Sequence, residues 1–153
     1  MFLTVHAAAG ILIGEQTSSP WLAFFLGIAS HLVLDMIPHG DENLVSNKNQ
    51  KTRFYKYMVI SALDTLGVIV LAFILWQKNK INLSLPQLAA IVGAVLPDYI
   101  WGLSEITHWN FTTVLTKKIF EWFHDFFKVR LTVAKGLVVQ LIVLSGLLYL
   151  IIK

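Results

Sequence analysis

The sequence predicts an all-α protein, an integral membrane helical bundle of about five or six helices. Hydrophobic residues make up 56% of the 153 residues, and the mean hydropathy is +0.68. Charged residues are 14% of the chain, whereas a soluble domain has about 25%. Several apolar stretches approach the roughly 20 residues that a helix needs to cross a bilayer. The length suits one membrane-embedded helical domain, residues 1–153.

The first half of the chain holds three of the predicted helices. Residues 2–14 form a short apolar stretch, and residues 20–38 form a longer one. Ser19-Pro20 marks the start of the second stretch, because Ser caps a helix well and Pro fits its first position. Residues 57–76 are apolar apart from Ser61, Asp64 and Thr65. This stretch predicts a complete membrane span.

The second half predicts two further spans and one helix of a different kind. Residues 85–103 and 133–152 have the length and hydropathy of spans. Between them, residues 111–129 mix Phe and Trp with Lys, Glu and Asp. That amphipathic pattern predicts a helix that lies in the membrane interface.

Charge and cysteine content restrict location and chemistry. Lys and Arg gather in residues 40–56 and 105–135, with few in residues 77–84. The positive-inside rule then predicts that the first residues lie in the cytoplasm. The start lacks the basic region of a signal peptide, so we expect the first helix to be retained. The net charge of +3 sits in loops, which argues against nucleic-acid binding. With no Cys, any metal must be held by imidazole and carboxylate groups.

Ionisable residues inside the apolar stretches are the most informative feature of the chain. A charge in hydrocarbon costs roughly 2.5–3.5 kcal/mol on insertion scales, so several of them need a common reason. His31 and Asp35 stand four residues apart and share one helix face. In the predicted topology they lie in the cytoplasmic leaflet together with three others. The predicted metal ligands are His6, His31, Asp35, Asp64 and Asp98.

These donors predict a divalent metal, with zinc favoured because imidazole and carboxylate suit it. The metal would lower the pKa of a bound water to about 7 and give a hydroxide nucleophile. The predicted catalytic residues are His39 and Asp41, and Asp35 would be the general base if it does not ligate. The polar loop 39–52 would line the mouth of the site. The predicted function is hydrolysis of an ester or phosphoester, such as a lipid head group, at the bilayer surface.

Each of these residues could instead have a purely structural role. His31 and Asp35 form a plausible buried hydrogen-bonded pair, and Asp64 can bond a neighbouring helix. The same holds for residues at predicted helix ends and in loops: His6, His39, Asp41, Asp98, His108 and His124. Two other functions therefore stay open, a polar centre that only binds an ion or locks helices together, and a small transport or proton-relay component.

One run resembles a known signature. Gly27-Ile-Ala-Ser-His31-Leu-Val-Leu-Asp35-Met-Ile-Pro38 is similar to the Gly-x-x-Ser-His-x-x-x-Asp-x-x-Thr/Pro motif of the predicted inner-membrane metal-dependent hydrolases, remote relatives of the zinc-dependent phospholipase C fold. Val95-Leu96-Pro97-Asp98 resembles a second element of that family, Leu-Leu-Pro-Asp, although here it follows the first element instead of preceding it. Thr4-Val5-His6-Ala7-Ala8-Ala9-Gly10 resembles the family's His near the start of a helix. The resemblance implies an all-helical bundle, a divalent metal, and His6, His31, Asp35 and Asp98 as its ligands. The expected location is the cell inner (cytoplasmic) membrane, which the same resemblance implies.

Overall fold

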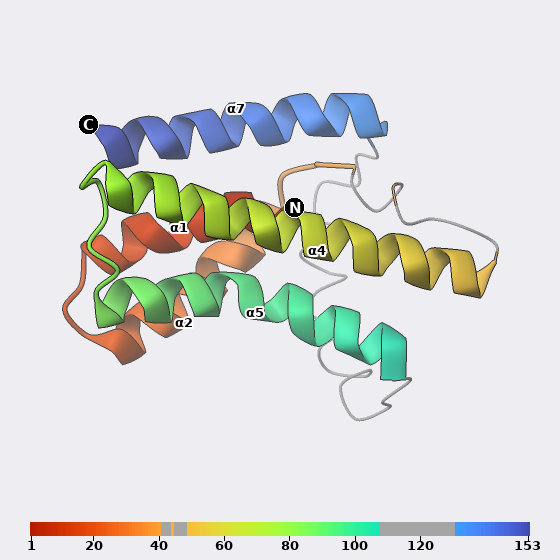
Figure 1. Ribbon diagram of the computed structural model, residues 1–153, viewed down its shortest axis with the longest axis horizontal. Helices are drawn as coiled ribbons and strands as arrows, with labels where there is room; N and C mark the ends of the chain where they lie inside the picture. Colours follow the sequence, from red (N-terminus) through yellow and green to blue (C-terminus); the bar gives the residue numbers. More distant parts are fainter. Residues whose placement is uncertain (41–43, 45–48, 108–130) are drawn as a thin grey trace.

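The computed structural model describes residues 1–40, 44, 49–107 and 131–153. These residues form five α-helices and no β-strand, so the predicted all-α class is confirmed for the described part of the chain. The helices run side by side along the long axis of the molecule (Figure 1). They are α1 (Leu3–Glu15), α2 (Pro20–Asp35), α4 (Gln50–Gln77), α5 (Leu85–Thr107) and α7 (Val133–Ile152).

Helix α1 is the centre of the bundle. It packs against α2, α4, α5 and α7, and most of its residues are buried, including His6 and Ile11. Small residues such as Ala7, Ala8 and Gly10 let the surrounding helices approach it closely. The residues near its start therefore meet several other helices at once, and this places the candidate site.

Two helix starts carry side-chain caps. Ser19 Oγ accepts from Leu22 N at 3.4 Å, with Pro20 in the first turn, as the sequence predicts. Asn49 Oδ1 accepts from Lys51 N at 3.0 Å. Helix α4 therefore begins at Gln50, seven residues before the predicted stretch 57–76. The predicted start lies too far along the chain, because hydropathy marks where a helix becomes apolar, whereas a cap marks where it begins.

Helices α2 and α5 cross with their backbones nearly in contact. A Cβ on Gly27 would overlap the carbonyl of Ala90, and one on Gly93 would overlap the carbonyl of Phe24. Pro97 lies inside α5, which continues to Thr107 past the predicted end at residue 103. Proline has no N–H, so it interrupts the hydrogen-bond ladder of α5 in the turn before Asp98.

Two of the described helices are long and apolar enough to cross a membrane, over Lys51–Gln77 and Val133–Ile152. Helix α2 ends at Asp35, so it is shorter than the predicted stretch 20–38. Helices α1 and α2 are apolar but shorter than a span. The predicted interfacial helix 111–129 lies outside the described residues.

Candidate metal centre

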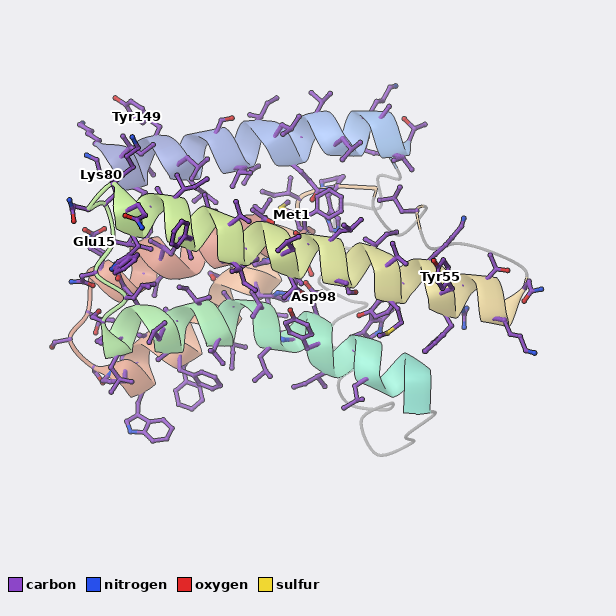
Figure 2. The ribbon with its side chains drawn as sticks, viewed as in Figure 1. Met1, Glu15, Tyr55, Lys80, Asp98 and Tyr149 are labelled. Atoms are coloured by element: carbon purple, nitrogen blue, oxygen red, sulfur yellow. The ribbon has the colours of Figure 1, made fainter. Side chains whose placement is uncertain are left out.

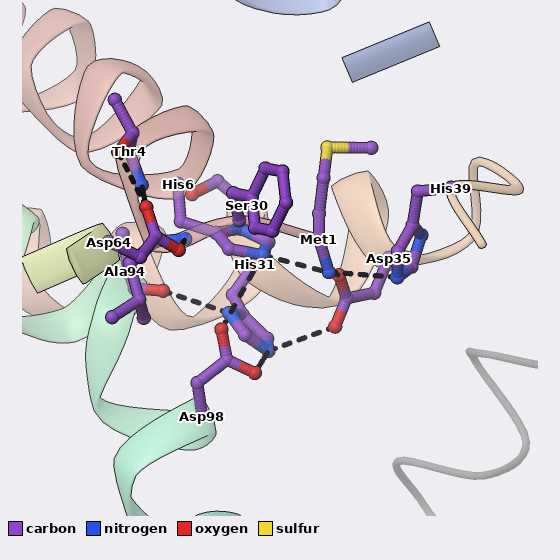
Figure 3. A network of polar contacts seen from close by, with 12 residues as sticks. Met1, Thr4, His6, Ser30, His31, Asp35, His39, Asp64, Ala94 and Asp98 are labelled. Atoms are coloured by element: carbon purple, nitrogen blue, oxygen red, sulfur yellow. Dashed lines mark hydrogen bonds and ion pairs between the residues drawn. The ribbon is translucent and has the colours of Figure 1, made fainter. Parts of the chain in front are cut away.

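His6 and His31 lie against each other where α1 crosses α2 (Figure 3). Their ring centroids are 4.1 Å apart with an interplanar angle of 28°. His6 is 0% exposed and His31 is 1% exposed, so neither ring reaches solvent. Two imidazoles buried together need polar partners, because an unpaired buried polar group costs about 1–3 kcal/mol.

His31 has one partner that fixes its tautomer. Its Nδ1 lies 2.9 Å from the carbonyl oxygen of Ala94, beside the interruption at Pro97. A carbonyl only accepts, so Nδ1 carries the hydrogen. The Nε2 of a neutral ring then turns a lone pair toward Asp35 Oδ2, which is 3.1 Å away. That contact is favourable only with a cation between the two atoms, either a proton on Nε2 or a metal ion.

Among the described residues, His6 has no hydrogen-bond partner on either ring nitrogen, and both atoms are buried. Its Nε2 lies 3.2 Å from Asp35 Oδ1, but the ring is not aligned for a hydrogen bond there. A cation near Nε2 would satisfy that atom, whereas Nδ1 keeps no partner among the described residues. The Nε2 of His6 is thus an atom that could ligate a metal ion.

Two carboxylates stand beside the imidazoles. Asp35, with its side chain 12% exposed, puts one oxygen near each ring, at the 3.1 and 3.2 Å just given. Asp98 does the same from α5: Oδ2 is 3.8 Å from His6 Nε2, and Oδ1 is 3.9 Å from His31 Nε2. The pair brings two negative charges to a largely buried place, and a divalent cation would neutralise them.

The donor spacing suits a metal. One ligand atom each from His6, His31 and Asp98 lies within 4.8 Å of the others. Four ligands about 2.0–2.1 Å from a tetrahedral zinc are about 3.3 Å from one another. The four His–Asp spacings of 3.1, 3.2, 3.8 and 3.9 Å bracket that length. The His6–His31–Asp98 group can therefore hold a metal ion, with Asp35 in place as a fourth ligand or an acceptor beside it.

Asp64, the remaining predicted ligand, is engaged elsewhere. Its Oδ1 accepts from Thr4 N at 3.1 Å and from Thr4 Oγ1 at 2.6 Å, and its Oδ2 accepts from Leu3 N. Asp64 thus caps the start of α1, whose own N-cap residue, Phe2, supplies no side-chain hydrogen bond. The structure brings together four of the five predicted ligands and gives the fifth to the helix that carries His6.

Of the two predicted catalytic residues, one is described. His39 is 3% exposed, its Nδ1 donates to Ile37 O at 2.7 Å, and its Nε2 lies 2.8 Å from the amino group of Met1. That amino group also donates to Asp35 Oδ1 at 2.7 Å, so His39 reaches Asp35 through Met1. Asp41, and likewise His108 and His124, lie outside the described residues.

Gln140 of α7 belongs to the surroundings of the site, although its importance is not evident from the sequence. It is 3% exposed, its Oε1 accepts from Phe2 N at 2.7 Å, and its Nε2 donates to His39 O at 3.3 Å. It thereby ties α7 to the start of α1 and to the turn after α2. The available signal was an amide side chain within an otherwise apolar stretch, which marks a polar contact but not its partners.

No protein-family model, curated protein or solved structure matches this chain. Its function is therefore argued from the geometry above.

Proposed function

We propose that this chain is a membrane-bound, metal-dependent hydrolase that cleaves an ester or phosphoester. The observation that carries the proposal is the buried His6 Nε2, which has no hydrogen-bond partner in the described part of the chain and stands among His31, Asp35 and Asp98. Two imidazoles with carboxylates and no thiolate favour zinc as the metal. The resemblance of the Ser30-His31 to Asp35 run to the predicted inner-membrane metal-dependent hydrolases points the same way.

In the proposed reaction, His6, His31 and Asp98 would hold the metal. The bound metal would lower the pKa of a coordinated water to about 7 and make it a nucleophile near neutral pH. Asp35 is within 3.2 Å of both imidazoles and is the carboxylate placed to accept a proton. Ala94 O orients His31 through Nδ1, an outer interaction of the kind that fixes metal-binding imidazoles. His39 and Asp41 remain the proposed catalytic residues of the loop at the mouth.

The distribution of apolar side chains supports a bilayer location for the bundle. The buried centre carries two histidines and small residues, whereas large apolar side chains point outward from α2, α4 and α7 (Figure 2). A soluble monomer rarely exposes a continuous apolar surface of this kind. Examples with more than half of their surface exposed are Trp21, Phe25, Leu63, Ile69, Leu141 and Ile142.

The proposed orientation puts the metal group on the cytoplasmic side of the inner membrane. Lys51, Arg53 and Lys56 lie at the start of α4, and positively charged residues favour the cytoplasm. Met1 and Asp64 both line one cavity with Tyr57, which lies near those charges. The start of α1 itself contacts Asp64, near the middle of α4, so the metal group lies within the bundle and the cavity extends from it toward the charged end.

A second candidate is a polar centre without catalysis. The contacts of Met1 with Asp35 and His39 favour it, because they show that polar groups here can partly satisfy one another. A proton relay across the membrane is disfavoured, since an apolar cluster packs along α1 beyond the site. That cluster is Ala8, Ile11, Leu75, Ile81 and Ile151.

Hydrolysis can be tested with the full chain in phospholipid vesicles supplied with zinc. We expect release of a head group or acyl chain that stops with a chelator and returns with zinc. Asp98→Asn should abolish turnover, because it removes the carboxylate charge that faces both imidazoles. Gln87→Leu is the matched control, since Gln87 is a buried polar residue of the same helix in another cavity. Zinc-loaded protein that cleaves no ester or phosphoester would overturn the proposal in favour of the non-catalytic centre.

A further inference from the structure

A cavity of about 110 Å³ adjoins the metal group. The start of α1 forms its floor, and α4 and α5 form its two walls. A cavity of about 150 Å³ can hold a benzene molecule, so this one has room for a group of somewhat smaller size. The cavity therefore fits one end of a substrate and not a whole lipid. The wall residues that matter here are Tyr57, Ile60, Ser61, Asp98, Tyr99 and Trp101.

One wall residue connects the cavity with the metal group. Asp98 lines the cavity, and the same carboxylate stands 3.8 Å from His6 Nε2 and 3.9 Å from His31 Nε2. In Figure 2 Asp98 lies in the gap between α4 and α5. A group that fills the cavity would thus lie beside the carboxylate that holds the metal.

The two walls are joined by side chains. Helix α1 packs against both α4 and α5, which make little backbone contact with each other. Tyr57 OH donates to the carbonyl of Asp98 at 3.2 Å, and its ring fills the space over Gly102. Thr65 Oγ1 and Tyr99 OH are 2.6 Å apart. Because side chains rotate more easily than helices move, the tyrosines frame an opening that can widen.

The surface around this opening is apolar and aromatic. Tyr99 and Trp101 are each 42% exposed on α5, and Met58 and Val59 are exposed on α4 next to Tyr57. Aromatic residues of this kind gather where a bilayer meets water. In the proposed membrane location, the opening would therefore face lipid near the head groups.

We propose that this opening between α4 and α5 admits an amphiphilic ester or phosphoester sideways from the bilayer. The hydrolysable group enters the cavity beside Asp98, while the hydrocarbon chain stays outside between Tyr57 and Tyr99. The inference rests on the proposed function, and it names the substrate class as a membrane lipid that carries its ester next to the head group.

The test fills the cavity and counts bound lipid. Ile60→Trp places an indole in the cavity, and Leu63→Trp is the matched control because Leu63 is 64% exposed on the same helix. Each protein is purified from bilayers of phosphatidylglycerol and phosphatidylcholine, and its retained phospholipid is counted by native mass spectrometry. Retention in Ile60→Trp should fall about tenfold, a change of roughly 1.4 kcal/mol. It should not change in Leu63→Trp. Ser61→Leu fills the cavity with a smaller side chain and gives the same readout if the indole prevents folding.

The outcomes separate this inference from the proposed function, because lipid retention does not depend on turnover. If wild type, Ile60→Trp and Ser61→Leu retain equal amounts of phospholipid, the proposed lipid entry between α4 and α5 is refuted, even if the protein binds zinc and hydrolyses a substrate. Equal loss in Leu63→Trp would also overturn it, since the lipid would then sit on the outer face of α4. If lipid retention falls in Ile60→Trp but not in Leu63→Trp, and the wild type binds no zinc, the opening is supported and the hydrolase proposal is refuted. Ile60→Trp could also turn over both a short water-soluble ester and a lipid as fast as the wild type does. That result would exclude entry of the lipid through this opening.

Discussion

The two ends of helix α1 are built differently. At its start, His6 lies among His31, Asp35 and Asp98, and Asp64 caps the helix. Further along, Ala8 and Ile11 pack in an apolar cluster with side chains of α4 and α7 and the connection after α4. The apolar end needs only close packing, whereas every polar atom at the other end needs a partner. The comparison implies that substitutions at the apolar end change stability alone, and that those at the polar end also change ligand binding.

The largest effect is expected at the unpartnered imidazole. His6→Gln should weaken zinc binding more than about 100-fold, because it removes a ligand, and loss of an outer partner alone costs 10–100-fold. Calorimetric titration of the metal-stripped protein measures this affinity. His39→Gln is the control, a buried histidine outside the metal group. Equal affinity in His6→Gln and wild type would remove His6 from the centre.

The next largest effect is expected at the apolar end of α1, where a substitution should lower stability without changing zinc affinity. Ile11→Ala deletes a side chain that is 1% exposed, which should lower the free energy of unfolding by about 2–4 kcal/mol. Its zinc affinity should match that of the wild type. Denaturant titration in detergent and the same calorimetric titration check both parts. A large loss of zinc affinity would show that the two ends are not independent.

A smaller effect on both properties is expected at the cap. Asp64→Ala leaves Leu3 N and Thr4 N without their acceptor, which should destabilise the fold by about 1–2 kcal/mol. Because the cap holds the turn before His6, zinc affinity should also fall, by up to about tenfold. Ser61→Ala is the control one turn away. An affinity loss as large as that of His6→Gln would instead make Asp64 a direct ligand, as the sequence predicts.

The smallest effect is expected on α7. Gln140→Leu removes hydrogen bonds to Phe2 N and His39 O, and such bonds within a membrane are worth about 0.6 kcal/mol on average. We expect a loss of about 0.5–1 kcal/mol in unfolding free energy and a few-fold loss of zinc affinity. Ser145→Ala, on the exposed side of α7, should change neither quantity. A gain in stability would show that the buried amide is not satisfied.

The comparison also explains what the sequence predicts well. His31 and Asp35 are four residues apart on one helix, so their proximity follows from helix geometry. His6 and Asp98 were expected at the same depth because both interrupt apolar stretches near the same membrane face. Local spacing and depth along a span are properties of a sequence, and the structure brings these four residues together.

What the sequence leaves undetermined depends on contacts between distant segments. A partly buried carboxylate that caps a neighbouring helix looks the same in sequence as one that binds a metal, so Asp64 was predicted as a ligand. The contact of His31 with Ala94 and those of Gln140 depend on how four helices, α1, α2, α5 and α7, pack. The prediction carried α5 through Pro97 but ended it at residue 103, because the apolar stretch stops at Ser104 and Glu105, whereas the helix continues to Thr107.

Binding of one divalent metal ion at the polar end of α1 is measured through the metal content of the purified chain after zinc is supplied. Elemental mass spectrometry compares the wild type with His31→Gln and His39→Gln. We expect one zinc per chain in the wild type and in His39→Gln, and none in a folded His31→Gln. A folded wild type that holds no zinc would contradict metal binding at this end of α1. The imidazoles and carboxylates would then be a hydrogen-bonded lock between α1, α2 and α5.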